Sequence, residues 1–355
     1  VYEISPLKKM SNRIEGEYTF NAGRNGFNIG NTYTNRNVFG GAELLEVKAR
    51  YGVLFDATAQ GSFLDRIFSR DLQLGVNIVT PKLLVPFRIP IMGKNGVPRT
   101  TIASNFQLFD QKEAFSSRVF VNSITYDWVE TKTKLHSFTP INIEFRKGKL
   151  DPVFRDSLIQ RGFELYVRTN DRQFFNLGSQ YAFTLNGVKL NSYSNFWFFR
   201  GTMDMAGNSL GLLNQVLQFN RDADGFRTLL GLPYQQYVKT EIDLRYYRSL
   251  GGEKQFVARI NPGIGLAYGN SDQLTFEKNF FAGGSSGVRA WQARTLGPGN
   301  YNRAVLGSDG KADTLRLNLR NLDQLGEIKF EANLEYRFKI ANNILNAKVK
   351  GATFA

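Results

Sequence analysis

Apolar and polar residues alternate with a period of two along most of this chain. In residues 45–55, for example, the odd positions are apolar or aromatic, whereas Glu46, Lys48 and Arg50 occupy even positions. Because the side chains of a β-strand point alternately to opposite faces, this pattern predicts strands with one apolar and one charged face. Strands of about ten residues suit a tilted membrane crossing, whereas those of soluble domains average about five or six.

The alternation predicts roughly fourteen to fifteen strands, joined by tight turns and longer loops as in outer-membrane barrels. The expected strands are 14–21, 27–33, 45–55, 70–86, 102–109, 118–131, 133–146, 163–169, 174–185, 194–203, 237–247, 255–268, 315–320, 331–338 and 345–354. Within 133–146, Pro140 argues against a strand, because proline cannot donate to a sheet ladder. Residues 151–161 fit a short helix in a loop, and 207–234 fit a long irregular loop.

Composition restricts the class of protein further. The chain has 355 residues, 42% of them hydrophobic, and no cysteine, which excludes disulfides and thiolate metal sites. No run of about 18 apolar residues occurs, so no transmembrane helix is expected. A soluble all-β protein and a transmembrane β-barrel remain. Charged residues on one face of nearly every strand favour the barrel, because a wet lumen accepts charges that a dry core does not.

The net charge of +14 indicates a basic lumen or rim, or attraction to anionic lipids or an acidic partner. A nucleic-acid partner is not predicted, because Lys and Arg are spread along the strands and form no recognisable basic element. Residues 1–10 lack the features of a secretory signal. A single histidine, His136, and the absence of a Gly-x-Ser-x-Gly elbow predict no enzyme, no metal site and no cofactor.

The segment 280–299, FFAGGSSGVRAWQARTLGPG, is the most distinctive part of the chain. Its glycines Gly283, Gly284 and Gly287 suggest a phosphate cradle, but no Gly-Lys-Ser/Thr ending or following helix supports that interpretation. A glycine-rich loop that re-enters a barrel and places Arg289 inside it fits better. Phe280 and Trp291 are expected either to anchor such a loop or to belong to an interfacial aromatic belt.

The sequence GGSSGVRAW followed by RTLGPG resembles the lid-loop motif of the BamA/TamA superfamily of outer-membrane insertases. The family form is Val-Arg-Gly-aromatic, and here the motif reads Val288, Arg289, Ala290, Trp291, with alanine in place of glycine. The Arg-Ala-Trp variant is most similar to the TamA-like branch of Bacteroidetes-type bacteria. EANLEYRF at 331–338, GATFA at 351–355 and YTNRNVFGGAELL at 33–45 also resemble the family, in the family order.

The resemblance implies an all-β fold, a transmembrane antiparallel β-barrel of sixteen strands. Residues 1–355 are then one barrel domain with a lid loop at about 280–300, apparently without the last strand and without the N-terminal periplasmic modules. The resemblance also implies that Arg289 pairs inside the barrel with Glu335 and with an aspartate that would follow Ala355. An enclosed arginine–carboxylate pair is strongly oriented, whereas an ordinary solvated loop arginine is the alternative.

The implied function is assembly or insertion of outer-membrane or surface proteins through a gated seam, without covalent catalysis or a cofactor. The seam strand would carry Glu15, Gly16 and Tyr18, and its glycines suggest a weakly specified register, although ordinary strand curvature explains them equally. Expected partners are outer-membrane lipids, client proteins, and a TamB-like inner-membrane protein or accessory lipoproteins. The alternatives are a two-partner-secretion transporter, which passes an unfolded client through its lumen, and a passive porin.

Overall fold

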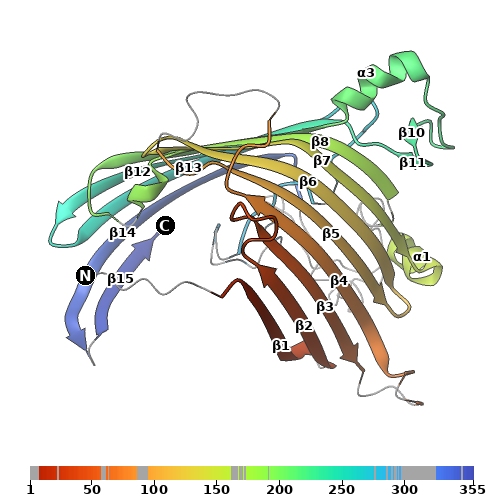
Figure 1. Cartoon of the computed structure of the whole chain (residues 1–355), viewed down its shortest axis with the longest axis horizontal. Coiled ribbons are helices and arrows are strands. Elements are labelled where there is room, and N and C mark those ends of the chain that lie inside the picture. The colour runs from red at the N-terminus through yellow and green to blue at the C-terminus, as the bar shows by residue number, and fades with distance from the viewer. Residues whose placement is uncertain are drawn as a thin grey trace, which may run out of the picture. The chain divides into compact units, whose positions relative to one another are not determined.

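The computed structural model describes residues 8–21, 24–56, 61–62, 64–85, 95–160, 167, 171, 173–190, 192–275, 277–284, 287–288, 291, 294, 296, 325–344 and 347–355. Within these residues the chain forms a thirteen-stranded sheet in the order β1-β2-β3-β4-β5-β6-β7-β8-β9-β12-β13-β14-β15, and a two-stranded hairpin of β10 and β11 (Figure 1). Neighbouring strands therefore follow the chain order throughout the large sheet.

The strands of the large sheet are eight to seventeen residues long, as the alternation predicts. They are β1 (Met10–Asn21), β2 (Arg24–Asn35), β3 (Leu44–Phe55), β4 (Ile67–Thr80), β5 (Arg99–Gln111), β6 (Phe115–Thr131), β7 (Lys134–Leu150), β8 (Gln173–Leu185), β9 (Phe196–Ala206), β12 (Tyr237–Gly251), β13 (Lys254–Ala267), β14 (Ile328–Ile344) and β15 (Ala347–Phe354). The short elements are α1 (Pro152–Gln160), a 3₁₀ turn (Gly187–Lys189), α3 (Asn208–Leu217), β10 (Thr228–Leu229) and β11 (Leu232–Pro233).

The candidate strand at 133–146 is confirmed as β7, which runs for 17 residues through Pro140. Pro262 is likewise paired with Phe330 within β13 and β14. Residues 207–234 are not wholly irregular, because they contain α3 and the β10–β11 hairpin. The expected helix at 151–161 is confirmed as α1, and the expected strand at 315–320 lies outside the described residues.

Contacts divide the chain into two compact units. The first contains residues 1–129, 137–180 and 206–236, and the second contains 130–136, 181–205 and 237–355. In the first unit, β1 to β5 pair antiparallel with long registers, and the β1–β2 register is unbroken from Met10–Asn35 to Asn21–Arg24. In the second unit, β12 to β15 also pair antiparallel.

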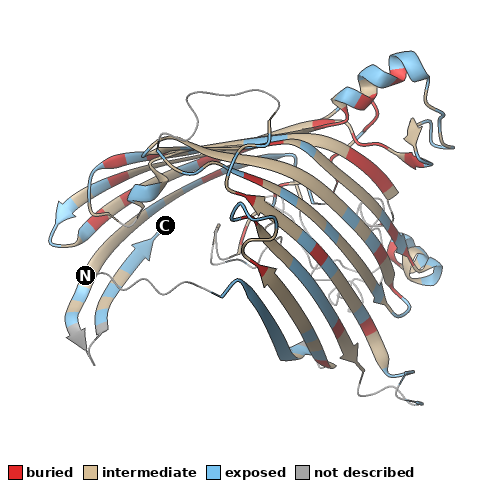
Figure 2. Ribbon diagram, viewed as in Figure 1, coloured by how far each residue is buried: buried red, intermediate tan, exposed pale blue. Residues whose placement is uncertain are grey.

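Each unit has one exposed apolar sheet face. In the first unit, Ile14 is 74% exposed and Ile29 is 63% exposed, and buried residues are sparse along β1 to β5 (Figure 2). In the second unit, Ile264, Ile328 and Phe330 are exposed in the same way. Exposure of large contiguous apolar faces to water is unfavourable, and lipid is the environment in which such faces are stable.

The buried apolar residues of the described chain gather in small clusters. Phe175, Leu210, Leu232 and Tyr234 join α3 and the β10–β11 hairpin to β8 in the first unit. Leu150, Leu158 and Val167 hold α1 against the end of β7. In the second unit, Phe196, Phe198, Tyr247 and Val257 form a third cluster on β9, β12 and β13. No helix among the described residues is both long enough and apolar enough to cross a membrane.

Candidate functional site

The candidate site lies on the polar face of β12, β13 and β14, in the second unit. The antiparallel register places Arg245 opposite Arg259, and Arg259 opposite Asn333. The same register places Val257 between Tyr247 and Glu335 in the next row. Because alternate residues of a strand share a face, all of these side chains project to one side of the sheet.

Ion pairs connect the strands across this face. Arg245 and Arg259 are like charges in directly opposite positions, which is unfavourable by itself. Asp243 offsets this repulsion, because it lies 2.6 Å from Arg245 and 3.1 Å from Arg259. Arg259 continues the network to Glu331 at 3.1 Å. The Asp243, Arg259 and Glu331 side chains are largely buried, so water screens these pairs weakly.

A second pair on β14 joins Arg337 to Glu335 at 2.8 Å. Glu335 and Arg337, with Arg245 and Arg259, line a cavity of about 660 Å³. Gly287 and Val288 of the loop between β13 and β14 line the same cavity. The described part of the lid loop therefore lies against the charged wall of β12, β13 and β14.

Backbone hydrogen bonds fix the described part of this loop. The amide of Phe280 donates to the Gly326 carbonyl at 2.8 Å, and the amide of Gly326 donates to the Phe280 carbonyl at 2.9 Å. Further along, Gly284 donates to the Trp291 carbonyl at 2.9 Å. Gly283 and Gly284 have φ values of 90° and 87°, which glycine adopts without strain. These two glycines are thus required by the turn, and no phosphate group is needed to explain them.

The two aromatic residues of the loop behave differently. The Phe280 side chain is only 5% exposed, so the expectation that it anchors the loop is confirmed. The Trp291 side chain is 49% exposed, and its contribution to the loop is the carbonyl that accepts from Gly284. Trp291 therefore closes the loop through its backbone.

Arg289 and Ala290 lie outside the described residues, so the pair between Arg289 and Glu335 stays a prediction. A carboxylate that lies close to Gly287 is Glu331, which the sequence analysis did not single out. A Cβ built on Gly287 would lie 3.4 Å from Glu331 Oε2. Glu331 lies four residues before Glu335 on the same strand face, so the alternation of residues 331–338 contained the signal for it.

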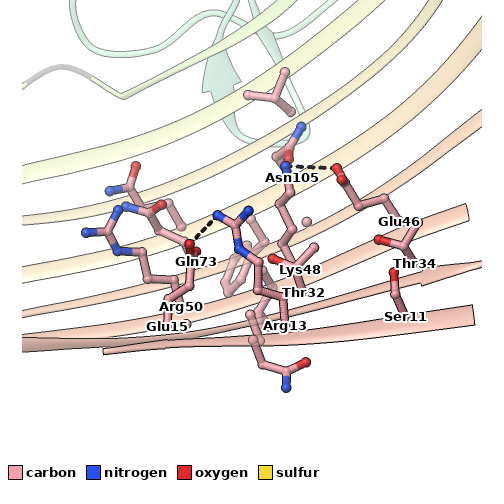
Figure 3. A pocket seen from close by; sticks show the side chains of 18 of the residues that line it. Ser11, Arg13, Glu15, Thr32, Thr34, Glu46, Lys48, Arg50, Gln73 and Asn105 are labelled. Carbon is pink, nitrogen blue, oxygen red and sulfur yellow. Dashed lines mark hydrogen bonds and ion pairs between the residues drawn. The ribbon is translucent and has the colours of Figure 1, made fainter. Parts of the chain in front are cut away.

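The expected seam residues lie on β1, in the first unit. Glu15 pairs with Arg13 on the polar face and lines a cavity of about 640 Å³ together with charged residues of β2 and β3, where Lys48 pairs with Glu46 at 2.8 Å (Figure 3). Gly16 is opposite Ile29, and the Tyr18 hydroxyl donates to Asn25 at 2.6 Å. Within the described residues, β2 is the only strand that pairs with β1.

His136 makes structural contacts. Its ring nitrogens lie 3.0 Å from Glu130 and 2.7 Å from the Tyr181 hydroxyl. In the described part of the chain, no group of three His, Asp or Glu side chains has a geometry that holds a metal ion. The site offers ion pairing and backbone hydrogen bonding as its chemistry.

A family profile described as the Omp85 superfamily domain matches residues 37–355. The structure is similar to BamA from Haemophilus ducreyi lacking POTRA domains 1–3, with a TM-score of 0.53 and 13% identity over 94% of this chain and 54% of that one. CdiB from Acinetobacter baumannii matches with a TM-score of 0.47 and 11% identity, over 98% of this chain and 49% of that one.

The chain spans about half the length of these two solved structures. The similarity to BamA supports the fold alone, because the identity is low, and the weaker similarity to CdiB carries no argument. No curated protein sequence matches the chain.

Proposed function

This chain belongs to the Omp85 superfamily, and from that premise we propose that it assembles or inserts other outer-membrane or surface proteins through a barrel seam that opens. Its thirteen-stranded antiparallel sheet corresponds to the Omp85 barrel. Omp85 barrels lie in the bacterial outer membrane and are insertases or transporters without enzymatic activity. That this chain is an assembly protein, and not a transporter, is our proposal.

The observation that carries the proposal is the position of the lid loop. Gly287 and Val288 line one cavity with Glu335, Arg337 and Arg259 on the strand wall. The motif match of the same loop favours an insertase or transporter over a passive porin, and a conductance measurement separates the two classes. We infer that Arg289, next to Val288, joins this wall and pairs with Glu335.

The proposed mechanism uses hydrogen bonding at the free edge of β1. An incoming client strand in lipid has unsatisfied N–H and C=O groups, each of which costs several kcal/mol. An edge strand satisfies those groups by adding the client strand to its sheet. Within the described residues β2 is the strand that pairs with β1, and we propose that the other edge of β1 becomes this template when the seam opens. No bond is made or broken covalently in this process, and no nucleotide is needed.

Finer assignments also belong to this proposal. The Arg-Ala-Trp motif and the Leu-Gly-Pro-Gly that follows it favour the TamA-like branch of the superfamily. The proposed partners are outer-membrane lipids, client barrels, and a TamB-like inner-membrane protein or accessory lipoproteins. The net charge of +14 favours partners with anionic head groups or acidic segments.

We predict that Arg289→Ala and Glu335→Ala each lower the assembly of other outer-membrane proteins severalfold. The physical reason is that removing either side chain abolishes the proposed ion pair and with it the attachment of the loop to the strand wall. The measurement is the amount of folded client barrels in cells that depend on the variant, detected by their heat-modifiable migration on gels.

The matched controls are Arg155→Ala and Asp156→Ala, which remove the same two charge types from an exposed pair on α1. These controls are expected to assemble clients normally. Wild-type assembly by both the Arg289 and the Glu335 variants would show that the lid has no role. A large, steady pore formed by the unmodified protein in planar bilayers would identify a porin.

A further inference from the structure

The lid loop has a root, residues 277–282, that is distinct from its arginine motif. The root lies between β13 and Gly283, whose φ is 90°. Within the root, the amides of Lys278 and Asn279 both donate to the Thr275 carbonyl, at 2.9 and 3.1 Å. These bonds form a compact turn that directs the Lys278 and Phe280 side chains to separate partners.

Lys278 reaches across the polar face to β9. Its ammonium lies 2.7 Å from Asp204, and the two side chains are only 17% and 14% exposed. The Tyr237 hydroxyl, on β12, donates to the same carboxylate at 3.3 Å. A carboxylate that accepts from two donors in a largely buried position is held in one orientation.

The electrostatic environment keeps Lys278 charged. Burial alone lowers the pKa of an ammonium, but the neighbouring Tyr237 hydroxyl and Asp204 carboxylate outweigh burial and raise the pKa of Lys278 above its ordinary value. Lys278 therefore stays charged throughout the physiological range of pH.

Phe280 supplies the second attachment of the root. A Cβ built on Gly263 would lie 2.6 Å from Phe280 Cζ, so the ring packs directly on the backbone of β13 where that strand has no side chain. The ammonium of Lys239 lies 4.1 Å from the centre of the same ring, within the distance at which a cation is attracted to an aromatic face. The ring thus fits a space that only glycine leaves open.

We propose that the Lys278–Asp204 ion pair is a positioning contact that fixes the root of the lid loop to β9, independently of the Arg289 motif. Its importance for client assembly rests on the function proposed above, but the attachment itself does not. Because Phe280 and the Gly326 bridge hold the same segment to β13 and β14, the root has attachments to several strands. A change in the lid that breaks the Arg289 pair therefore leaves residues 277–282 in place.

Hydrogen exchange tests the attachment directly, because the amides of Phe280 and Gly326 bond to each other's carbonyls. The variants are Asp204→Asn and Lys278→Met, each of which removes one charge. In the complete protein in detergent micelles, we expect both amides to exchange about tenfold faster or more, since exchange reports local opening and one unpaired buried charge favours the open form.

The control is Glu241→Gln. Glu241 pairs with Lys329 at 3.1 Å between β12 and β14, on the same face, so this variant breaks an interstrand ion pair of similar length without a bond to the root. It is expected to leave exchange at Phe280 and Gly326 unchanged. The double variant Asp204→Lys, Lys278→Asp swaps the two charges and restores the ion pair. It is expected to regain most of the protection of the Phe280 and Gly326 amides from hydrogen exchange.

Heat-modifiable gel migration establishes that each variant is folded. Folded single variants with wild-type exchange at Phe280 and Gly326 would overturn the proposal. If the single variants do not fold, the charge-swapped double variant is the test. Protected Phe280 and Gly326 amides in that variant would support the Lys278–Asp204 attachment, and its failure to fold would contradict the attachment. Faster root exchange combined with normal client assembly would leave the attachment standing and show that it plays no part in client assembly, whereas the Arg289 and Glu335 variants test the proposed function itself.

Discussion

At the scale of single residues, burial distinguishes the two carboxylates of β14. The Glu331 side chain is 9% exposed and pairs with Arg259, whereas the Glu335 side chain is 24% exposed and pairs with Arg337, which is 36% exposed. Burial decides how much an ion pair contributes to stability. Water screens the charges of an exposed pair, whereas the loss of one partner of a buried pair leaves the other charge buried and uncompensated. Glu331 is therefore expected to contribute more to stability than Glu335.

We predict that Glu331→Gln lowers the free energy of unfolding by about 3 kcal/mol, because Arg259 loses one of two carboxylates in a largely buried position. Glu335→Gln is expected to lower it by about 1 kcal/mol or less, as for a partly exposed pair. The measurement is urea unfolding of the protein in detergent or lipid vesicles. Equal losses for the two variants would contradict the claim that the more buried Glu331 contributes more to stability than Glu335.

The sequence located part of this residue network. The motif match identified Val288, Trp291 and Glu335, and the structure places Val288 and Glu335 on one cavity. It did not identify Lys278 and Asp204, which are 74 positions apart, because an ion pair between distant elements leaves no periodic or motif signal in a single sequence. The role of Arg289 remains a prediction from its motif.

At the scale of elements, alternation predicted the strands well and the loops poorly. Strands such as β3 and β4 have two distinct faces over more than ten residues, and that signal is robust. Helix α3 was missed because it is short, carries no charged residue, and leaves Leu212 and Val216 exposed, so it has no clear polar face. Its packing on Phe175 and Tyr234 is a tertiary contact that sequence pattern does not reveal.

Strand β1 offers an element-scale test of the proposed template. A Cβ built on Gly16 meets no atom within 4 Å, so Gly16→Ala is accommodated without a clash. Alanine favours a fixed strand over glycine by about 0.5–1 kcal/mol. If β1 must depart from its regular register during assembly, we predict that Gly16→Ala leaves unfolding unchanged or slightly more difficult. We also predict that it lowers client assembly about two- to fivefold, as expected for that energy.

The matched control is Gly30→Ala. Gly30 lies on β2, opposite Glu15 of β1. A Cβ built on Gly30 would lie 4.0 Å from the nearest atom, the Ala49 carbonyl oxygen, so an alanine also fits at this position. Strand β2 keeps β1 and β3 as neighbours, and normal client assembly is expected. Normal assembly by the Gly16 variant as well would favour the simpler explanation that Gly16 serves strand curvature.

At the scale of the whole molecule, the two faces of the strands carry the argument for a membrane barrel. In the first unit, exposed apolar residues such as Ile14 and Tyr51 lie on the face opposite to the Arg50–Glu17 pair. In the second unit, Ile264 lies on the face opposite to the Arg259–Glu331 pair. The sequence predicted this arrangement because the period of two needs only local information. The Omp85 membership over residues 37–355 agrees with it.

The most direct test of the central claim is a disulfide lock of the seam in cells. A cysteine in place of Tyr18 is combined with one in the strand proposed to close the seam against β1, in a chain that has no natural cysteine. A control pair replaces Ile29 and Tyr51, which are opposite each other on β2 and β3. We predict that oxidation of the seam pair stops the assembly of other barrels, that a reductant restores it, and that the control pair has no effect. Normal assembly with the seam fully oxidised would contradict the claim that client strands are templated at β1.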